Sequence, residues 1–173
     1  AVSIRAVASR CSVSAGTIYN YYESKADLLS DTIESIWHEI FFHPEDEQVF
    51  HDVESCISWI YERLEYGNRQ FPGFFSLHSF GFMRDEKTSG KKRMMKTWGH
   101  ILNGLCEVLE NDPKVRADVF DQEFTEKKFA DILFSLILVS MIRQDYDPSS
   151  VLMLVKKTLY VTVQSQAKFQ KQV

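Results

Sequence analysis

The spacing of apolar residues along the chain predicts a protein built of helices. Ile4, Val7 and Ala8 recur at helical spacing after Ser3, whose side chain can accept hydrogen bonds from the first backbone N–H groups of a helix. After an interruption at residues 11–13, Ser14 offers a second cap, to a short helix carrying residues 17–21. Two short helices joined by about three or four residues are typical of the helix-turn-helix unit, whose second helix enters the DNA major groove. The opening segment therefore predicts a DNA-binding head.

Longer helices are predicted beyond this head. Ser24 is placed to cap a helix that continues to about residue 42, with apolar residues at positions 29, 33, 36 and 40. The same reasoning predicts helices over 49–64 (ended by Gly67 and Asn68), 74–83, 95–109, 125–143 and 149–166, with a turn of helix within 115–120. Because no stretch alternates as a strand does, the predicted fold class is all-α.

The last two predicted helices carry more apolar surface than one chain is expected to cover. Residues 132–142 leave almost no polar face on the first, and the second has apolar residues at 151, 152, 155, 159 and 163. Symmetric pairing of two copies would bury this surface in a four-helix interface. The alternative is a monomeric core with this hairpin at its centre. The apolar run is shorter than the roughly 20 residues of a membrane-spanning helix, so no membrane partner is expected.

An ordered run of residues extends from Val13 to Leu29. It comprises Val13-Ser14, Gly16-Thr17-Ile18-Tyr19, Tyr21-Tyr22, and Lys25 followed by Leu28-Leu29. In this order and spacing it resembles the TetR family of bacterial transcription regulators. The resemblance implies that residues 14–21 form the recognition helix, that Tyr19 and Tyr21 approach the phosphate backbone, and that Lys25 contacts a phosphate. The DNA-binding residues expected on this basis are Ser3, Arg5, Ser14, Ala15, Gly16, Thr17, Tyr19, Asn20, Tyr21 and Lys25.

More specific expectations apply to Asn20 and to Tyr22. The side-chain amide of Asn20 can pair with adenine N6 and N7. Tyr22 is expected to pack inward, since the family has an apolar residue at that position. The alternative for the whole segment is a helical hairpin with no nucleic-acid role, because capping serines occur in any helical protein.

The segment departs from the family pattern in three places. Ser12 occupies a turn position that usually holds glycine, so its backbone must either avoid positive φ or adopt it at some cost. Ala15 stands where many relatives have lysine or another polar residue, which leaves specificity more to Thr17 and Asn20. The family also has a helix before Ser3, so we expect that the sequence lacks the true N-terminus and begins in a truncated head.

The resemblance implies two domains, an incomplete DNA-binding head with its connecting helix at 1–42 and a helical ligand-binding and dimerisation domain at 43–173. Large apolar and aromatic side chains in the middle helices are expected to surround a pocket for an unknown apolar or aromatic effector: Trp59, Phe75, His78, Phe82, Met95, Trp98 and Leu102, with Glu62 and Glu65 at its edge. An ordinary core is the alternative for each of them. The expected dimer interface consists of Phe129, Leu133, Leu136, Ile137, Ser140, Leu152, Val155, Leu159 and Val163.

The charge distribution is compatible with DNA as a partner although the net charge of −4 is acidic. Affinity for DNA comes largely from neutralised phosphates, and Arg5, Arg10 and Lys25 against Glu23 leave the opening segment positive. The three cysteines are widely spaced among apolar neighbours. They predict reduced, buried thiols in a cytoplasmic protein rather than disulfides or a metal cluster.

No enzymatic motif is found. His38, His43 and His51 lie near residues 45–47, which are acidic, but their spacing matches no zinc motif, so no metal and no cofactor are expected. Two function classes stay open. One is a homodimeric repressor of a palindromic operator, released when a ligand tilts the helix over 24–42; the other is a DNA-binding regulator controlled by a protein partner or by no effector. A roomy apolar cavity between the middle helices favours the first, and a solid core the second.

Overall fold

The computed structural model describes residues 3–43, 49–75 and 89–161, with the backbone alone over 89–97. This part of the chain is helical and contains no strand. Its elements are α1 (Ile4–Arg10), α2 (Ala15–Tyr19), α3 (Lys25–Phe41), α4 (Val53–Gln70), α6 (Ser89–Asn111), α7 (Glu126–Arg143), α8 (Ser149–Val155) and the π-helical turn η2 (Lys156–Tyr160). None of the helices described has the length and apolarity needed to cross a membrane.

Three serines begin the first three helices, as the sequence predicts. Oγ of Ser3 accepts from the Ala6 N–H at 3.1 Å, and Oγ of Ser14 accepts from the Thr17 N–H at 3.0 Å. Ser24 does the same for α3. Each cap satisfies a backbone donor that has no partner inside the helix. The starts of α1, α2 and α3 are therefore fixed by local sequence.

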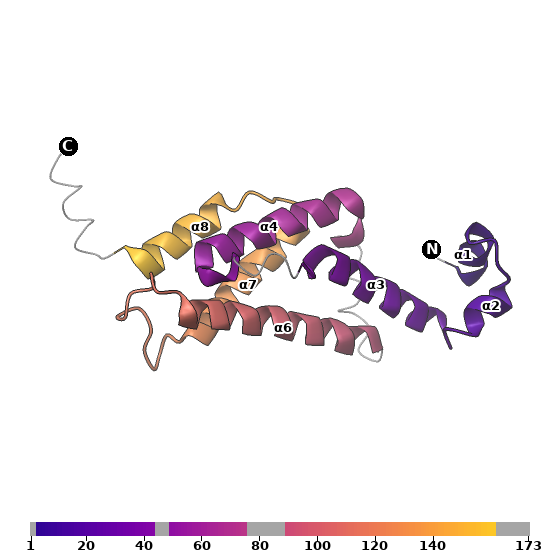
Figure 1. Ribbon diagram of the computed structural model, residues 1–173, viewed down its shortest axis with the longest axis horizontal. Helices are drawn as coiled ribbons and strands as arrows, with labels where there is room; N and C mark the ends of the chain where they lie inside the picture. The colour runs from indigo at the N-terminus through magenta and orange to yellow at the C-terminus, as the bar shows by residue number, and fades with distance from the viewer. Residues whose placement is uncertain (1–2, 44–48, 76–88, 162–173) are drawn as a thin grey trace.

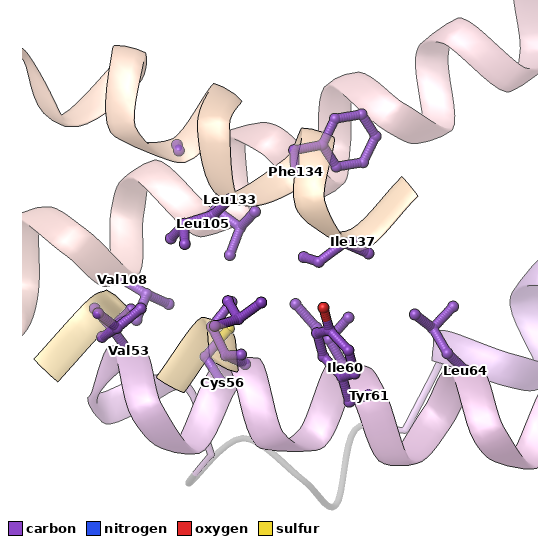
Figure 2. Packing of buried hydrophobic residues seen from close by; sticks show 14 of the residues in the cluster. Val53, Cys56, Ile60, Tyr61, Leu64, Leu105, Val108, Leu133, Phe134 and Ile137 are labelled. Atoms are coloured by element: carbon purple, nitrogen blue, oxygen red, sulfur yellow. The ribbon is translucent and has the colours of Figure 1, made fainter. Parts of the chain in front are cut away.

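The head and the body have separate cores. Figure 1 shows α1 and α2 at one end of the molecule, with α3 running from them to the bundle of α4, α6, α7 and α8. In the body, one face of α4 meets α6 and α7: Figure 2 shows Val53, Cys56, Ile60 and Leu64 opposite side chains of the other two helices. α3 thus connects two apolar clusters that share no residue.

Gly67 lies inside α4 and does not end it, which corrects the helix boundary predicted from the sequence. A β-carbon at this position would lie 2.6 Å from Cδ1 of Ile40 and 3.0 Å from Cζ of Phe75. The glycine serves the close approach of α3 to α4, and the helix runs on to Gln70.

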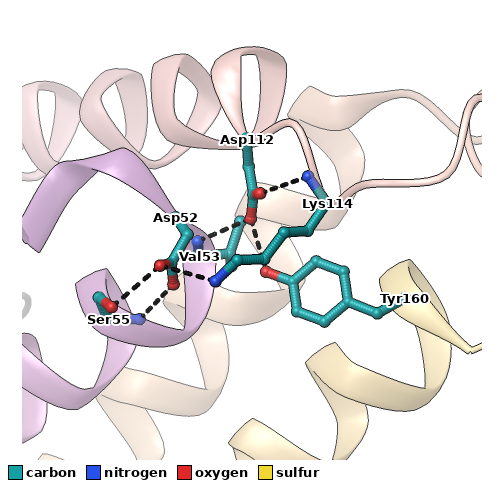
Figure 3. A network of polar contacts seen from close by, with 6 residues as sticks. All are labelled: Asp52, Val53, Ser55, Asp112, Lys114 and Tyr160. Carbon is teal, nitrogen blue, oxygen red and sulfur yellow. Dashed lines mark hydrogen bonds and ion pairs between the residues drawn. The ribbon is translucent and has the colours of Figure 1, made fainter.

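A buried carboxylate ties together three segments at the end of the body far from the head. Asp112, only 4% exposed, accepts from the N–H of Val53 at 3.0 Å and of Lys114 at 2.8 Å, and from the hydroxyl of Tyr160 at 2.5 Å (Figure 3). Lys114 also forms an ion pair with Asp52, the N-cap of α4. The network joins the start of α4, the end of α6 and η2.

Other predictions need correction. Residues 115–120 form turns rather than helix. Cys11 is exposed, because it is the C-cap of α1 and only Ile4 and Ala8 of that helix are buried; Cys56 is buried and Cys106 half-buried, and all three are free thiols. The last predicted helix is described as far as Tyr160, where a π-helical turn ends it, and residues 162–166 lie outside the described part.

Candidate DNA-binding surface

The turn between α1 and α2 contains a left-handed serine. Ser12 has φ 55°, so it adopts the positive φ that the sequence left open. Its N–H donates to Ser9 O at 3.3 Å, and the N–H of Val13 donates to Ala8 O at 3.0 Å, which closes the turn. The left-handed conformation costs an L-residue about 1–2 kcal/mol relative to its right-handed one. Hydrogen bonds therefore close the turn, but its backbone is strained at Ser12.

α2, the second helix of the unit, is short and well capped. Besides accepting from the Thr17 N–H, Oγ of Ser14 lies 2.9 Å from Oγ1 of Thr17. The helix ends at Tyr19, with Asn20 as its C-cap, so it is shorter than the span of 14–21 that the resemblance implies. The reason lies in the backbone: the N–H groups of Tyr21 and Tyr22 both donate to Ile18 O, and the chain then leaves toward Ser24.

The two helices pack around a small core. Ile4, Ala8 and Ile18 are buried, and partly buried side chains of Val7, Ala15, Tyr22 and Leu28 surround them. Tyr22 therefore packs inward, as predicted. Because Leu28 belongs to α3, this core also holds the start of the connecting helix against the head.

A polar contact reinforces that attachment. The Tyr22 hydroxyl donates to Oδ2 of Asp31 at 3.0 Å, and this hydrogen bond, together with the charge of Asp31, raises the pKa of Tyr22 above its usual value. The sequence pattern does not predict this role of Asp31. The one relevant feature of Asp31 in the sequence is that it lies one helical turn after Asp27, on the same helix face.

Most of the side chains expected to meet DNA are exposed. Tyr19 is 55% exposed and Tyr21 80%. Ala15 and Thr17 are half-buried, Ala15 against the head core. The remaining expected residues are all exposed: Ser3, Arg5, Ser14, Gly16, Asn20 and Lys25. We call these exposed residues with Tyr19 and Tyr21 the recognition surface.

Gly16 on this surface is not required by the packing of the head. A β-carbon there would meet only Oγ of Ser14, at 3.5 Å, which is an ordinary contact, and its φ is not left-handed. A glycine costs helix stability relative to alanine by roughly 0.5–1 kcal/mol. Its place in α2 therefore has no explanation within the described part of the chain.

One side of the head is acidic. Tyr21, Tyr22, Glu23, Asp27 and Asp31 line an open depression of about 290 Å³. Its three carboxylates repel phosphates. Because Asp27 and Asp31 add their charges to that of Glu23, the head is less uniformly positive than the sequence predicts.

A second candidate site is the apolar seam between α3, α4, α6 and α7. It encloses a cavity of only about 10 Å³. That is about the space of one water, whereas sites for small organic ligands take hundreds of Å³. Its lining is wholly apolar: Trp37, Phe41, Ile60, Leu64, Trp98, Ile101, Phe134, Ile137, Leu138 and Met141.

Of the side chains expected around an effector, Trp98 lines the seam itself, and Phe75 and Trp59 contact residues that line it. Phe75 packs against Trp37 with ring centroids 5.8 Å apart. Trp59 meets Phe41 and Phe50. Leu102 packs against the body core without lining the seam, and Glu62 and Glu65 are exposed. His78, Phe82 and the Met95 side chain lie outside the described residues.

Many residues expected at a dimer interface are turned into the chain's own core. Phe129, Leu133, Ile137, Val155 and Leu159 are buried. Leu136, Ser140 and Leu152 are half-buried, with Ser140 hydrogen-bonded to the Tyr61 hydroxyl at 2.8 Å, and Val163 lies outside the described part. The apolar side chains left exposed on the same helices are Ile132, Val139 and Ile142 of α7 and Met153 and Leu154 of α8. We call these five the apolar row.

Within the described residues, no group of three or more His, Cys, Asp or Glu side chains is arranged to hold a metal ion. His43 contacts the Glu39 carbonyl at 3.2 Å, and residues 44–48, next to it, are not described.

Comparison with known proteins bears on the head. Residues 1–32 match the family model described as bacterial regulatory proteins of the tetR family. No curated protein and no solved structure matches the chain significantly. The matched residues contain both capped helices, the turn at Ser12 and the recognition surface, and the rest of the described chain is helical. Residues 1–32 therefore carry a DNA-binding head of the tetR type, and this match supports a DNA-binding transcriptional regulator.

Proposed function

We propose that this regulator is a repressor that binds a palindromic operator as a homodimer. The observation that carries the proposal is the recognition surface, in which Tyr19 at the end of the capped α2, the following Asn20 and Tyr21, and Lys25 at the start of α3 are all exposed. Aromatic hydroxyls, a cation and backbone N–H groups are the groups that position a protein on phosphates, and an exposed amide can read a base edge.

Gly16 supports a close approach of α2 to DNA. Since the head does not need a glycine there, its absent side chain is best explained by a partner whose surface comes near the backbone. The acidic depression lined by Glu23, Asp27 and Asp31 borders the recognition surface at Tyr21, so its carboxylates would lie at the edge of the contact with the duplex, away from the phosphates.

Pairing of two copies is proposed through the apolar row. Val139 of α7 is 46% exposed and Met153 of α8 is 54% exposed, and a chain in water gains by covering such side chains. A two-fold axis through this row would give an isologous interface. Two recognition surfaces so related would meet major grooves about 34–36 Å apart, which calls for a palindromic operator.

Release by a small apolar or aromatic effector is proposed to act at the seam. Trp37 and Phe41 line it and belong to the end of α3, the helix that carries the head. A ligand that wedges the seam open would displace this end of α3. Ligand and DNA would then favour different positions of the head, which is the only requirement for coupling.

One observation favours a second candidate, a regulator with a protein partner or with no effector. The seam is filled, with a cavity of about 10 Å³, so a ligand has to separate α3, α4, α6 and α7 before it binds. A thermal-shift screen with apolar aromatic compounds separates the two. A compound that raises the melting temperature and lowers DNA affinity supports release by a ligand; compounds that bind without changing DNA affinity support the second candidate.

The proposed function is tested by selecting bound sequences from a random duplex pool. The expected outcome is one palindromic consensus, with two copies bound. For the interface, Val139→Glu should convert a dimer to a monomer in sedimentation, because it places a charge in the apolar row. Lys127→Glu, an exposed position of α7 outside that row, is the matched control. A monomeric wild type, or a variant at Val139 that stays dimeric, contradicts the interface.

A further inference from the structure

The end of α3 is held by a side chain from α4. Nε of Arg63 donates to the Ile40 carbonyl at 2.5 Å, and Nη2 donates to the Glu39 carbonyl at 3.3 Å. These carbonyls lie in the last turn of α3, where helix carbonyls run out of intrahelical partners. The cation also sits at the negative end of the helix macrodipole, which favours it further.

The guanidinium is itself kept in place. Cζ of Arg63 lies 4.4 Å from the centroid of the Tyr66 ring, one turn further along α4. A planar group stacked on an aromatic face can direct two N–H donors at two neighbouring acceptors. A lysine at the same position would offer a single point of attachment with freely rotating donors.

The other end of α3 is held by the head. Leu28 packs in the head core, and Asp31 accepts from the Tyr22 hydroxyl. α3 spans 17 residues, which at 1.5 Å per residue is about 25 Å. A change of about 10° in its direction at the Arg63 end therefore moves the head by roughly 4 Å. A displacement of that size breaks hydrogen bonds to a groove.

We propose that Arg63 is a positioning residue that sets the direction of α3, and through it the placement of the recognition surface. This inference rests on the proposed function for its effect on DNA, but the positioning itself can be measured without DNA. Arg63 belongs neither to the recognition surface nor to the residues that line the seam, and its hydrogen bonds to another helix are to α3, so its effect on the head is expected to pass through α3.

The test measures the head relative to the body within one chain. Spin labels are attached at exposed Cys11 and at Ser150→Cys on α8, in a chain that also carries Cys106→Ser. Burial raises the pKa of the Cys56 thiol to about 12 and keeps it unreactive. Dilution with unlabelled chain leaves only distances within one chain to be observed.

Three variants are compared in this background. Arg63→Met should broaden or shift the distance distribution and weaken operator binding by tenfold or more. Arg63→Lys should have an intermediate effect, because it keeps the charge but loses the paired donors, and it serves alone if the methionine variant does not fold. Arg69→Met is the control, since Arg69 is 68% exposed and pairs only with Glu65 among described residues.

An unchanged distance distribution in a folded Arg63 variant overturns the inference, whatever happens to DNA affinity. A changed distribution in a protein that binds no selected sequence supports the positioning role and contradicts the proposed function instead. The two failures are therefore distinct.

Discussion

At Gly67 and Ile40, α4 comes close to the connecting helix: a β-carbon on Gly67 would lie 2.6 Å from Cδ1 and 3.0 Å from Cγ1 of Ile40. Ile40 is fully buried, so its side chain has no free space into which to turn. Gly67→Ala should therefore push α3 away from α4. Overpacking of this kind typically costs about 1–3 kcal/mol, against a gain in helix propensity of roughly 1 kcal/mol.

The net expectation for Gly67→Ala is a loss of stability with a loss of DNA affinity, measured by urea unfolding and by operator titration. Gly104→Ala is the matched control, since no described atom lies within 4 Å of its added β-carbon. It should stabilise α6 by up to about 1 kcal/mol. Equal effects of the two substitutions would mean that the approach of α3 to α4 is not tight.

Ser12→Gly should stabilise the head. The left-handed backbone at Ser12 strains serine but not glycine, so the substitution should gain about 1 kcal/mol. Because the head has its own core, the gain should appear as slower hydrogen exchange of α1 and α2 amides. Ser9→Gly, an exposed position inside α1, should do the opposite. Faster exchange with glycine at position 12 would contradict the role of the positive φ.

Gly16→Ala should separate folding from DNA binding. The added methyl meets only ordinary contact at Ser14, and alanine favours the helix by roughly 0.5–1 kcal/mol, so the head should become more stable. DNA affinity should nevertheless fall at least tenfold, because the backbone can no longer approach the duplex. Melting curves and titrations of the same samples check both halves. Unchanged affinity would remove Gly16 from the recognition surface.

Tyr160 should make the far end of the body sensitive to alkali. Burial, and then the hydrogen bond to Asp112, raise the pKa of Tyr160 well above its usual value of 10.0. In the unfolded chain this hydroxyl ionises near pH 10, whereas in the folded protein it keeps its proton. Its contribution to stability is therefore complete below pH 10 and decreases as the pH rises beyond it.

Tyr160→Phe checks this linkage by urea unfolding between pH 7 and about pH 11. At pH 7 the variant should be less stable by about 1 kcal/mol or more, since Asp112 loses a hydrogen bond. Tyr21→Phe is the control, because Tyr21 is 80% exposed. The deficit of the Tyr160 variant should shrink above pH 10; a deficit that stays constant would show that Tyr160 ionises equally in both states.

The local elements could be predicted from the sequence because short-range signals determine them. Ser3, Ser14 and Ser24 identify helix starts through hydrogen bonds to residues three positions on, and the structure confirms each of them. The same reasoning failed at Gly67. A glycine usually predicts the end of a helix, but this one lies inside α4 because α3, which is distant in sequence, packs closely against it. Local patterns carry no information on such approaches.

The sides of the last helices could not be assigned from pattern either. α7 is apolar nearly all round, so its sequence does not distinguish a side that faces α4 and α6 from one that faces outward. The structure turns Leu133 and Ile137 inward and leaves Ile132 and Val139 exposed. The role of Arg63 could not be predicted from the sequence either, because its hydrogen-bond acceptors are backbone carbonyls, which any sequence provides.

Binding of two copies to one operator is tested most directly by changing the spacing of the half-sites. The affinity for a selected palindrome is measured before and after about half a helical turn, roughly 5 bp, is inserted between them. We expect two copies to bind the original operator together, and the insertion to lower affinity at least a hundredfold, because one recognition surface then faces away from its groove. Lys25→Ala should weaken binding to the original operator and reduce the salt dependence by about one unit of slope. Unchanged affinity after the insertion would contradict the homodimeric repressor proposed here.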